Sequence, residues 1–258
     1  MDDLLVIIPT RGRPQAVMPI VRAWNDTGAT ADLLFAVDTD DPELAAYKRE
    51  AAKFKPGGQI RFTFGKRRRL VGTLNQQAVK AAKQYRFLAF MGDDHRPRPA
   101  AMPWDARIRE CLSGGPGIVY GNDLLQGEKM ATAVAMTSDI VTTLGYMAPP
   151  SMVHLCVDLV WVEWGRGMGR ITYLHDMIIE HLHPAAEKAD LDAVYEECNS
   201  EQQVSADTAA YYEYRDGGGL EADLAKLRTL VAYDQGGFLQ PGTSVARNTT
   251  GTAEEVVS

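Results

Sequence analysis

Adjacent acidic and imidazole side chains in Gly92-Asp93-Asp94-His95 directly follow the apolar stretch Phe87 to Met91. Two neighbouring carboxylates repel each other unless a cation neutralises them. Hard oxygen ligands at the end of a strand suit Mg²⁺ or Mn²⁺ together with a phosphorylated ligand. Asp and Gly are also ordinary turn residues, and a solvated turn in which Asp caps the next helix explains this motif equally well.

Four consecutive cations, Lys66-Arg67-Arg68-Arg69, stand just before a predicted helix in a protein that is acidic overall. Guanidinium groups beside a helix N-terminus favour phosphate, because free N–H groups and the helix dipole add to their charge. A solvated basic loop is the alternative. Nucleic-acid binding is a third interpretation, which is weakened because no aromatic residues are interleaved with these cations.

Two further positions carry side chains suited to metal binding or proton transfer. His181 and His183 are two residues apart in a predicted strand and therefore share one face, so a histidine from this strand could join the carboxylates at 93–94 in a metal site. Asp158 is the one carboxylate in an otherwise apolar helical segment, where burial would raise its pKa toward the range of a general base. A structural role for the histidines and a capping role for Asp158 are the alternatives.

The segments around these residues predict an α/β fold with a mostly parallel sheet and helices on both faces. Apolar runs predict strands near 4–8, 33–37, 60–64, 87–91 and 117–120, and helical spacing predicts helices near 14–24, 42–54, 70–84 and 102–112. Active sites of such sheets lie at the carboxyl ends of the strands. That edge is where Thr10-Arg11-Gly12-Arg13, Asp38 and the motif at 92–95 are expected.

After residue 130 the pattern predicts a strand at 131–136, helices at 138–144 and 153–164, and two strands at 171–174 and 177–183. Helical pieces near 186–197, 201–215 and 219–232 follow. The segment 235–258 has no periodicity and is expected to be disordered. We therefore expect a catalytic domain over 1–184, a helical extension over 185–234 and a tail over 235–258.

Composition excludes several classes of protein. The 258 residues include 34 acidic and 27 basic side chains, which gives a net charge of −7. Hydrophobic residues make up 45% and charged residues 24%, as in ordinary globular proteins. This composition excludes a disordered, coiled-coil or collagen-like chain. A pI near 5.3 argues against a broad basic surface that would bind nucleic acid or an anionic membrane. Three scattered cysteines and the opening Met1-Asp2-Asp3 predict a reduced, cytoplasmic protein without a secretion leader or membrane partner.

Taken in order, the segments resemble the GT-A fold glycosyltransferases, in particular the family 2 nucleotide-sugar transferases. Val6 to Pro14 resembles the first strand and nucleotide-binding loop of that family, and Arg67 to Ala78 resembles its basic segment before a helix. Phe87 to Asp94 is similar to the strand that leads into the Asp-x-Asp motif, with Gly92 in place of the first Asp. In that family an acidic residue lies near the acceptor, and the segment Asp158 to Trp161 resembles the segment that carries it. The stretch Ile178 to Pro184 resembles the last strand of the family's sheet.

The resemblance implies an inverting, Mn²⁺- or Mg²⁺-dependent transfer of a sugar from a nucleotide-diphospho-sugar to an acceptor hydroxyl. It implies that Asp158 is the catalytic base and that Asp94 and His181 bind the metal; Gly92 leaves open whether His95 joins them and whether His183 replaces His181. The residues that it assigns to the donor are Pro9, Thr10, Arg11, Arg13, Asp38, Arg67, Arg69, Asn75 and Asp93.

The C-terminal helical part, with Tyr211, Tyr212 and Tyr214, resembles predicted glycosyltransferases of bacteriophages, which would place the protein in the host cytoplasm. The acceptor of such an enzyme could be a modified DNA base, a virion protein or a glycan. Two other functions fit the same residues: a nucleotidyltransferase that makes an activated sugar, and a non-catalytic sugar- or nucleotide-binding module with the same fold. The sequence leaves the oligomeric state open.

Overall fold

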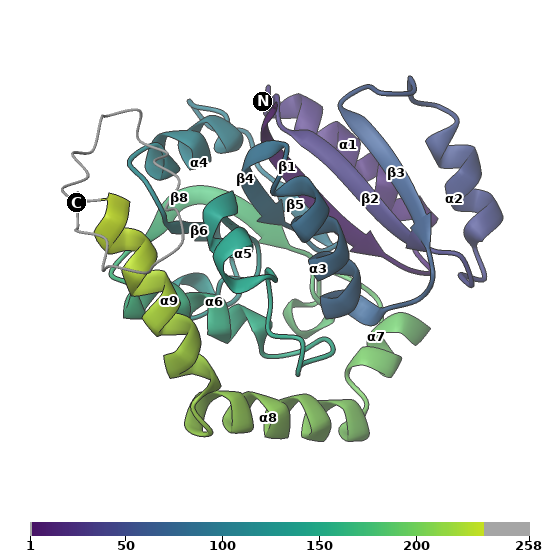
Figure 1. Ribbon diagram of the computed structural model, residues 1–258. Helices are drawn as coiled ribbons and strands as arrows, with labels where there is room; N and C mark the ends of the chain where they lie inside the picture. The colour runs from purple at the N-terminus through teal and green to yellow at the C-terminus, as the bar shows by residue number, and fades with distance from the viewer. Residues whose placement is uncertain (1, 235–258) are drawn as a thin grey trace.

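The computed structural model describes residues 2–234, so the predicted tail over 235–258 lies outside the described residues. Within them, eight strands form one sheet in the order β3-β2-β1-β4-β7-β6-β8-β5, with helices on both faces (Figure 1). The strands are β1 (Asp2–Thr10), β2 (Asp32–Asp38), β3 (Ile60–Gly65), β4 (Tyr85–Phe90), β5 (His95–Pro97), β6 (Ile118–Asn122), β7 (Val134–Thr137) and β8 (Ile171–His181).

Strand direction divides the sheet into two parts. β3, β2, β1 and β4 run parallel to one another, as the alternation of strands and helices predicts. β7 is antiparallel to β4 and to β6, β6 is parallel to β8, and β5 is antiparallel to β8. The α/β fold with a mostly parallel sheet is thereby confirmed, and the carboxyl ends of β1, β2, β4 and β8 come to one edge.

The helices cover the sheet unequally. The helices are α1 (Val17–Asp26), α2 (Leu44–Ala51), α3 (Arg69–Ala81), α4 (Trp104–Leu112), α5 (Ser138–Leu144), α6 (Val157–Gly167), α7 (Ala193–Cys198), α8 (Glu201–Asp216) and α9 (Gly219–Asp234), with short 3₁₀ turns at Pro14–Ala16, Gly127–Lys129 and Pro184–Ala186. One hydrophobic cluster contains side chains of α1, α2 and α4, and the other contains those of α3, α5, α6, α8 and α9. None of the described helices is long and apolar enough to cross a membrane.

The continuous apolar run at the start of the chain forms a central strand because both of its faces are buried. Leu5 and Ile7 of β1 point into the cluster beneath α3, while Leu4, Val6 and Ile8 point into the cluster beneath α1. Successive side chains of a strand alternate between faces, so a strand covered on both sides reads as unbroken hydrophobicity rather than as alternation.

The last strand of the sheet differs from its prediction. The two strands predicted at 171–174 and 177–183 are one strand, β8, in which the pairing register with β6 jumps from Leu174 to Ile178. The polar pair His175-Asp176 therefore lies in an irregularity of a continuous strand and not in a turn. Gly121 makes this possible, because a Cβ there would stand only 2.4 Å from the carbonyl oxygen of Met177.

Three other elements also differ from the sequence-based predictions. β5 (His95–Pro97) is too short for a pattern to reveal. α6 begins at Val157 rather than at residue 153, because Cys156 has a left-handed backbone (φ 68°). The helix predicted over 186–197 is reduced to α7, whose start is fixed by the Asp192 side chain accepting a hydrogen bond from Tyr195 N–H (2.8 Å).

Candidate functional site

A cavity of about 360 Å³ opens at the carboxyl edge of the parallel strands. Residues after β1, β2 and β4, the last part of β8, the first turn of α6 and the helix α7 contribute to its wall. With the exception of Asn75, the structure brings the sequence-predicted site residues together here: Pro9, Thr10, Arg11, Arg13, Asp38, Arg67, Arg69, Asp93, Asp94, Asp158 and His181. His95 and His183 also line it.

Asn75 lies apart from the other residues predicted to bind the donor, and its side chain forms hydrogen bonds with the backbone. It donates to the carbonyl of Ala148 (2.8 Å) and accepts from the backbone N–H groups of Met147 (2.8 Å) and Ala148 (2.9 Å). The amide thus ties α3 to the segment before α6, and Asn75 is not among the cavity-lining residues. Its polarity satisfies buried backbone rather than a ligand.

Asp93 is buried and its charge is met from within the protein. Arg13 donates to one of its carboxylate oxygens (2.8 Å) and Thr10 donates to the other (2.7 Å). Tyr47 in turn contacts the Thr10 hydroxyl (2.7 Å) and accepts from Arg13 N–H (2.9 Å). Asp93 therefore fixes the loop after β1, whereas the neighbouring Asp94 lies farther from the same arginine, at 4.0 Å from Arg13 Nη1.

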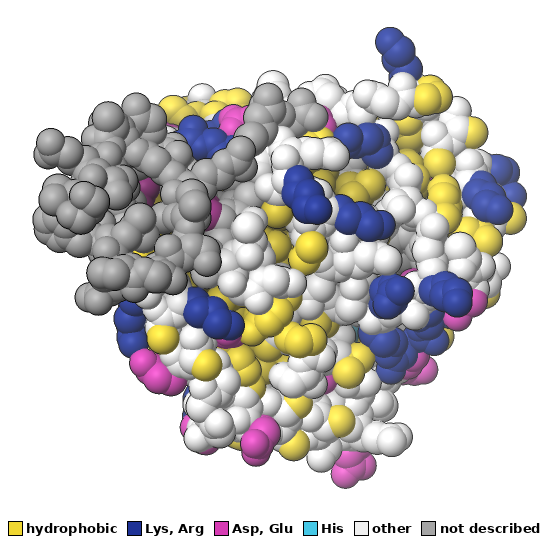
Figure 2. All heavy atoms as spheres, in the orientation of Figure 1, with side chains coloured by type: hydrophobic (Ala, Val, Ile, Leu, Met, Phe, Trp, Pro, Cys, Tyr) yellow, Lys and Arg dark blue, Asp and Glu magenta, His cyan; other side chains and the backbone are white. Residues whose placement is uncertain are grey.

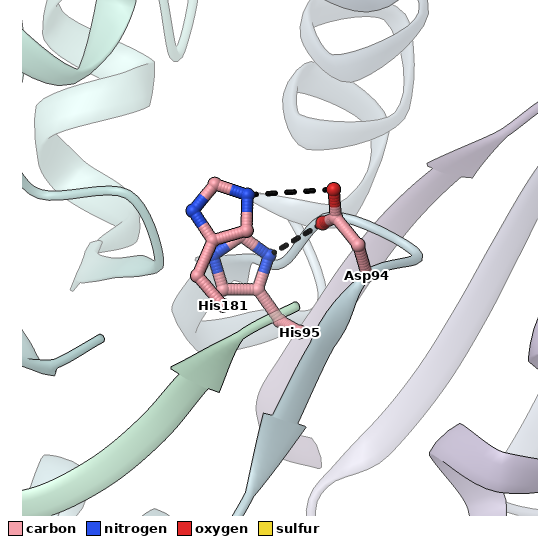
Figure 3. Close-up of side chains that lie close together, drawn as sticks. All are labelled: Asp94, His95 and His181. Atoms are coloured by element: carbon pink, nitrogen blue, oxygen red, sulfur yellow. Dashed lines mark ion pairs between the residues drawn. The ribbon is translucent and has the colours of Figure 1, made fainter. Parts of the chain in front are cut away.

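Asp94 faces two stacked imidazole rings, those of His95 and His181, whose centroids are 4.3 Å apart. Figure 3 shows both rings beside the Asp94 carboxylate, with His181 Nε2 at 3.4 Å from one oxygen and His95 Nδ1 at 3.1 Å from the other. The antiparallel pairing of β5 with β8 sets this geometry, because it places His95 directly opposite His181.

Gly92 explains why the first Asp of an Asp-x-Asp motif has no place here. A Cβ at Gly92 would lie 2.5 Å from the Asp94 carboxylate and 2.8 Å from His95 Nδ1. The Gly92 N–H also donates to His95 Nδ1 (3.0 Å). A side chain at this position would displace the residues that form the cluster.

Asp123, at the end of β6, is a charged neighbour of His181 that the sequence analysis missed. One of its oxygens accepts from the backbone N–H groups of Leu125, Gln126 and Gly127, and the other lies 3.9 Å from His181 Nδ1. Burial by itself lowers the pKa of His181, but Asp123 and Asp94 outweigh it and raise that pKa to about 9.

The donor set at Asp94 and His181 fits a divalent cation. Ligand atoms of Asp94, His95 and His181 all lie within 4.8 Å of one another. Nδ1 of His181 and Nε2 of His95 are both buried without a hydrogen-bond partner among the described residues. Nε2 of His181 faces Asp94, whereas Nδ1 of His95 already accepts from Gly92. One carboxylate and one imidazole, completed by oxygen ligands such as water, suit Mn²⁺ or Mg²⁺.

Asp158 lies in the first turn of α6 and lines the same cavity. Burial raises the pKa of its carboxyl group, and its one described hydrogen bond is accepted from the adjacent Leu159 N–H (3.0 Å). Unlike Asp93, Asp158 has no arginine or lysine paired with it among the described residues. A carboxylate with a raised pKa and no arginine or lysine paired with it is suited to accept a proton.

Asp207 of α8 positions the segment that leads into Asp158, and nothing in the sequence pointed to it. Its carboxylate, buried at 1% exposure, accepts from three successive N–H groups, those of Val153 (2.8 Å), His154 (3.0 Å) and Leu155 (2.8 Å). The next residue is Cys156, whose left-handed backbone is uncommon for a residue with a side chain. Asp207 thus holds a strained entry into α6.

The arginines of the cavity are paired with carboxylates. Arg11 donates to Asp38 (3.1 Å) and Asp40 (2.9 Å). Arg67 and Arg69 both contact Glu197 of α7. Glu197 was also missed by the sequence analysis, since it stands 128 residues from Arg69 in a segment without a recognisable motif.

Comparison with known proteins supports the fold assignment. No protein-family profile and no curated protein matches the sequence. Among solved structures, a mannosyltransferase of Pyrobaculum calidifontis (PcManGT), in complex with GDP-Man and Mn²⁺, is similar with a TM-score of 0.55 and 12% identity over 92% of this chain and 76% of that chain. S. aureus TarS 1-349 in complex with UDP-GlcNAc has a TM-score of 0.52 and 10% identity over 92% and 93% of the two chains. At these identities the likeness establishes a Rossmann-like glycosyltransferase fold.

Proposed function

We propose that this protein is a divalent-metal-dependent, inverting glycosyltransferase that moves a sugar from a nucleotide-diphospho-sugar to an acceptor hydroxyl. The observation that carries the proposal is the composition of one cavity. It combines a half-buried carboxylate without an arginine or lysine partner in the described part of the chain (Asp158), a metal-ligand pair (Asp94 and His181) and arginines at the carboxyl edge of a glycosyltransferase-like sheet. The neighbours solved with GDP-Man and Mn²⁺ and with UDP-GlcNAc support the choice of donor class.

The donor is expected to lie along the ends of β1 and β2. Asp38 and Arg11 are paired at the rim, where the carboxylate can accept from ribose or base groups. Arg67 Nε lies 4.0 Å from the Asp38 carboxylate, and Arg69 lines the same cavity. We expect the guanidinium groups of Arg67 and Arg69 to bind the diphosphate. The ion pair between Arg13 and Asp93 holds the loop after β1 in place.

Asp94 and His181 are the residues that would hold the metal ion. A bound divalent cation would stabilise the negative charge that develops on the departing diphosphate. His181 points Nε2 toward Asp94, and Asp123 stands behind its other nitrogen, an arrangement that orients a ligating imidazole.

Asp158 would take the proton of the acceptor hydroxyl. The hydroxyl oxygen forms a bond to the anomeric carbon while the bond from that carbon to the diphosphate oxygen breaks, and the nucleoside diphosphate leaves with the electron pair. Attack from the face opposite the leaving group inverts the anomeric configuration. The burial that raises the pKa of Asp158 favours this proton transfer near neutral pH.

The proposal is tested by a panel of nucleotide-sugars with Mn²⁺, using thermal stabilisation for binding and nucleoside diphosphate release for turnover. Asp158→Asn is expected to lower kcat by about 10²- to 10⁴-fold and to leave donor binding within about twofold of the wild type. Asp26→Asn, which alters an exposed carboxylate of α1, is the matched control and should behave as the wild type.

Turnover by Asp158→Asn at the wild-type rate would remove Asp158 from the role of base. Pyrophosphate release from a nucleoside triphosphate and a sugar phosphate would indicate a nucleotidyltransferase instead. Thermal stabilisation by a nucleotide-sugar without release of nucleoside diphosphate, whichever sugar acceptor is added, would favour a binding module.

A further inference from the structure

The two arginines placed to bind the diphosphate already hold an anion that belongs to the protein. Glu197 of α7 contacts Arg67 and Arg69 together, and Arg69 also donates to the Gln203 side chain (3.1 Å). Figure 1 shows α7 beside the N-terminal end of α3, where Arg69 stands. The carboxylate thus occupies the position between two guanidinium groups that a phosphate would otherwise take.

The segment that carries Glu197 is attached to the cavity by ion pairs and by half-buried side chains, among them Tyr195, whose ring centroid lies 5.2 Å from that of His183. α7 has no buried residue. Its entry is held by Asp192, which accepts from Arg13 Nε (2.6 Å) and Nη2 (2.9 Å). Partly exposed ion pairs contribute little free energy, because solvent screens them and two long side chains must be ordered. Glu197 has an exposed fraction of 39%, so its contact can be exchanged at small cost.

We propose that Glu197 is an internal anion that competes with the donor diphosphate for Arg67 and Arg69 and thereby limits donor affinity. The inference rests on the proposed function. A carboxylate and a diphosphate cannot share the two guanidinium groups without strong repulsion, so donor binding must displace Glu197. The free energy of the ion pairs that Glu197 loses then reduces the net free energy of donor binding.

Removing the charge of Glu197 should therefore tighten donor binding, the opposite of what loss of a donor-binding residue does. The measurement is the Kd of GDP and of UDP by calorimetry with Mn²⁺, for the wild type, Glu197→Gln and Glu196→Gln. Glu196 is the matched control, since it is the exposed neighbour in α7 and no ion pair of it occurs within residues 2–234. For whichever of the two nucleotides the wild type binds more tightly, the Kd of Glu197→Gln is expected to be about three- to tenfold lower than that of the wild type. The Kd of Glu196→Gln should equal that of the wild type.

Combination with Arg69→Gln locates the effect. In that background Glu197→Gln should give a clearly smaller gain, because one of the two guanidinium groups for which the anions compete is gone. Glu197→Ala repeats the test with a different side chain, and the melting temperature of each variant verifies that it is folded.

The outcomes separate this inference from the proposed function. A nucleotide that binds the wild type but binds Glu197→Gln and Glu197→Ala equally or more weakly overturns the competition alone. If neither nucleotide binds, the titration is repeated with the other common nucleoside diphosphates, and if none of them binds the wild type or the variants, the proposed function is wrong and the inference falls with it. A gain in Glu196→Gln equal to that in Glu197→Gln would reveal a general charge effect and also overturn the assignment.

Discussion

Three carboxylates of the cavity have different chemistry because their partners differ. Asp93 is neutralised by Arg13 and by the Thr10 hydroxyl, which leaves it a structural anion. Burial tends to raise the pKa of Asp94, but the hydrogen bond and the charge of His181 hold that pKa well below its usual range. Asp158 is half-buried without an arginine or lysine partner within residues 2–234, and its raised pKa suits a base.

At the residue scale, the metal-ligand pair gives a direct prediction. Asp94→Asn and His181→Ala should each weaken Mn²⁺ binding by more than about tenfold, because even the loss of a residue behind a ligand costs that much. The measurement is calorimetric titration of the metal-free protein with MnCl₂. His175→Ala is the control, since His175 is exposed on the same strand and outside the cavity. Equal affinity in all four proteins would contradict the ligand assignment.

At the scale of elements, buried carboxylates join helices to loops by accepting hydrogen bonds from the backbone N–H groups of those loops. Asp207 does this for the segment before α6. Asp105 of α4 does it for the loop before β2, accepting from Thr30 N–H (2.7 Å), Ala31 N–H (2.8 Å) and Arg109 (2.6 Å). Both loops lead into elements that end at or begin in the cavity, so helix packing and site geometry are coupled.

Asp105 makes the stability of the fold depend on pH. Burial tends to raise the pKa of this carboxyl, but Arg109 and the Thr30 and Ala31 amides lower it below its ordinary value. A lowered folded pKa means that the unfolded chain binds the proton more readily, so the stabilisation is present above about pH 4 and is lost as the pH falls through the folded pKa.

We therefore expect Asp105→Asn to lower the free energy of unfolding by about 2 kcal/mol at pH 7. The difference from the wild type should shrink as the pH is lowered below about 4. Urea unfolding at several pH values measures this, with the exposed Asp26→Asn as control. A difference that does not change with pH would show that the charge of Asp105 is not what stabilises the loop.

At the scale of the whole molecule, charge is distributed unevenly. The net charge is −7, yet residues 62–92 contain seven basic side chains and no acidic one. On the face seen in Figure 2, Lys and Arg side chains spread over the region of α2 and α3, and acidic ones mark the lower edge formed by α8. The carboxylates of α7 and α8 that reach Arg69, Arg13 and the α6 entry come from this acidic C-terminal part.

The C-terminal helices also share the main hydrophobic core. Tyr211 and Tyr214 of α8 and Leu224, Leu227 and Val231 of α9 belong to the same cluster as α3, α5 and α6. The boundary predicted at residue 184 remains a prediction, but α8 and α9 are packed as parts of one core.

Leu227→Ala should accordingly destabilise the whole protein in one cooperative transition, by about 2–5 kcal/mol. Leu227 has an exposed fraction of 0% and Leu191, the matched control, has 65%, so Leu191→Ala should change stability by less than about 0.5 kcal/mol. Urea unfolding followed by fluorescence checks both. A separate early transition confined to the Leu227→Ala variant would mean that α9 unfolds independently.

The sequence by itself determined the central elements and the position of their ends. β1, β2 and β4 are continuous apolar runs because both faces of a parallel sheet are covered, and a parallel sheet brings its carboxyl ends to one edge. Asp38 and Asp94 both line the cavity at that edge, because each stands at or just after the carboxyl end of such a strand. Local pattern and topology suffice for this part.

Only the tertiary structure decided which polar groups satisfy one another. Asn75 stands in a basic segment that predicts a ligand contact, yet its amide binds the backbone at 147–148. Asp207 and Glu197 lie in helices with no motif, yet they reach Val153 and Arg69 across 54 and 128 residues of chain. The hydrogen-bond partner of a buried polar group depends on packing between distant segments, and residue spacing along the chain does not encode that packing.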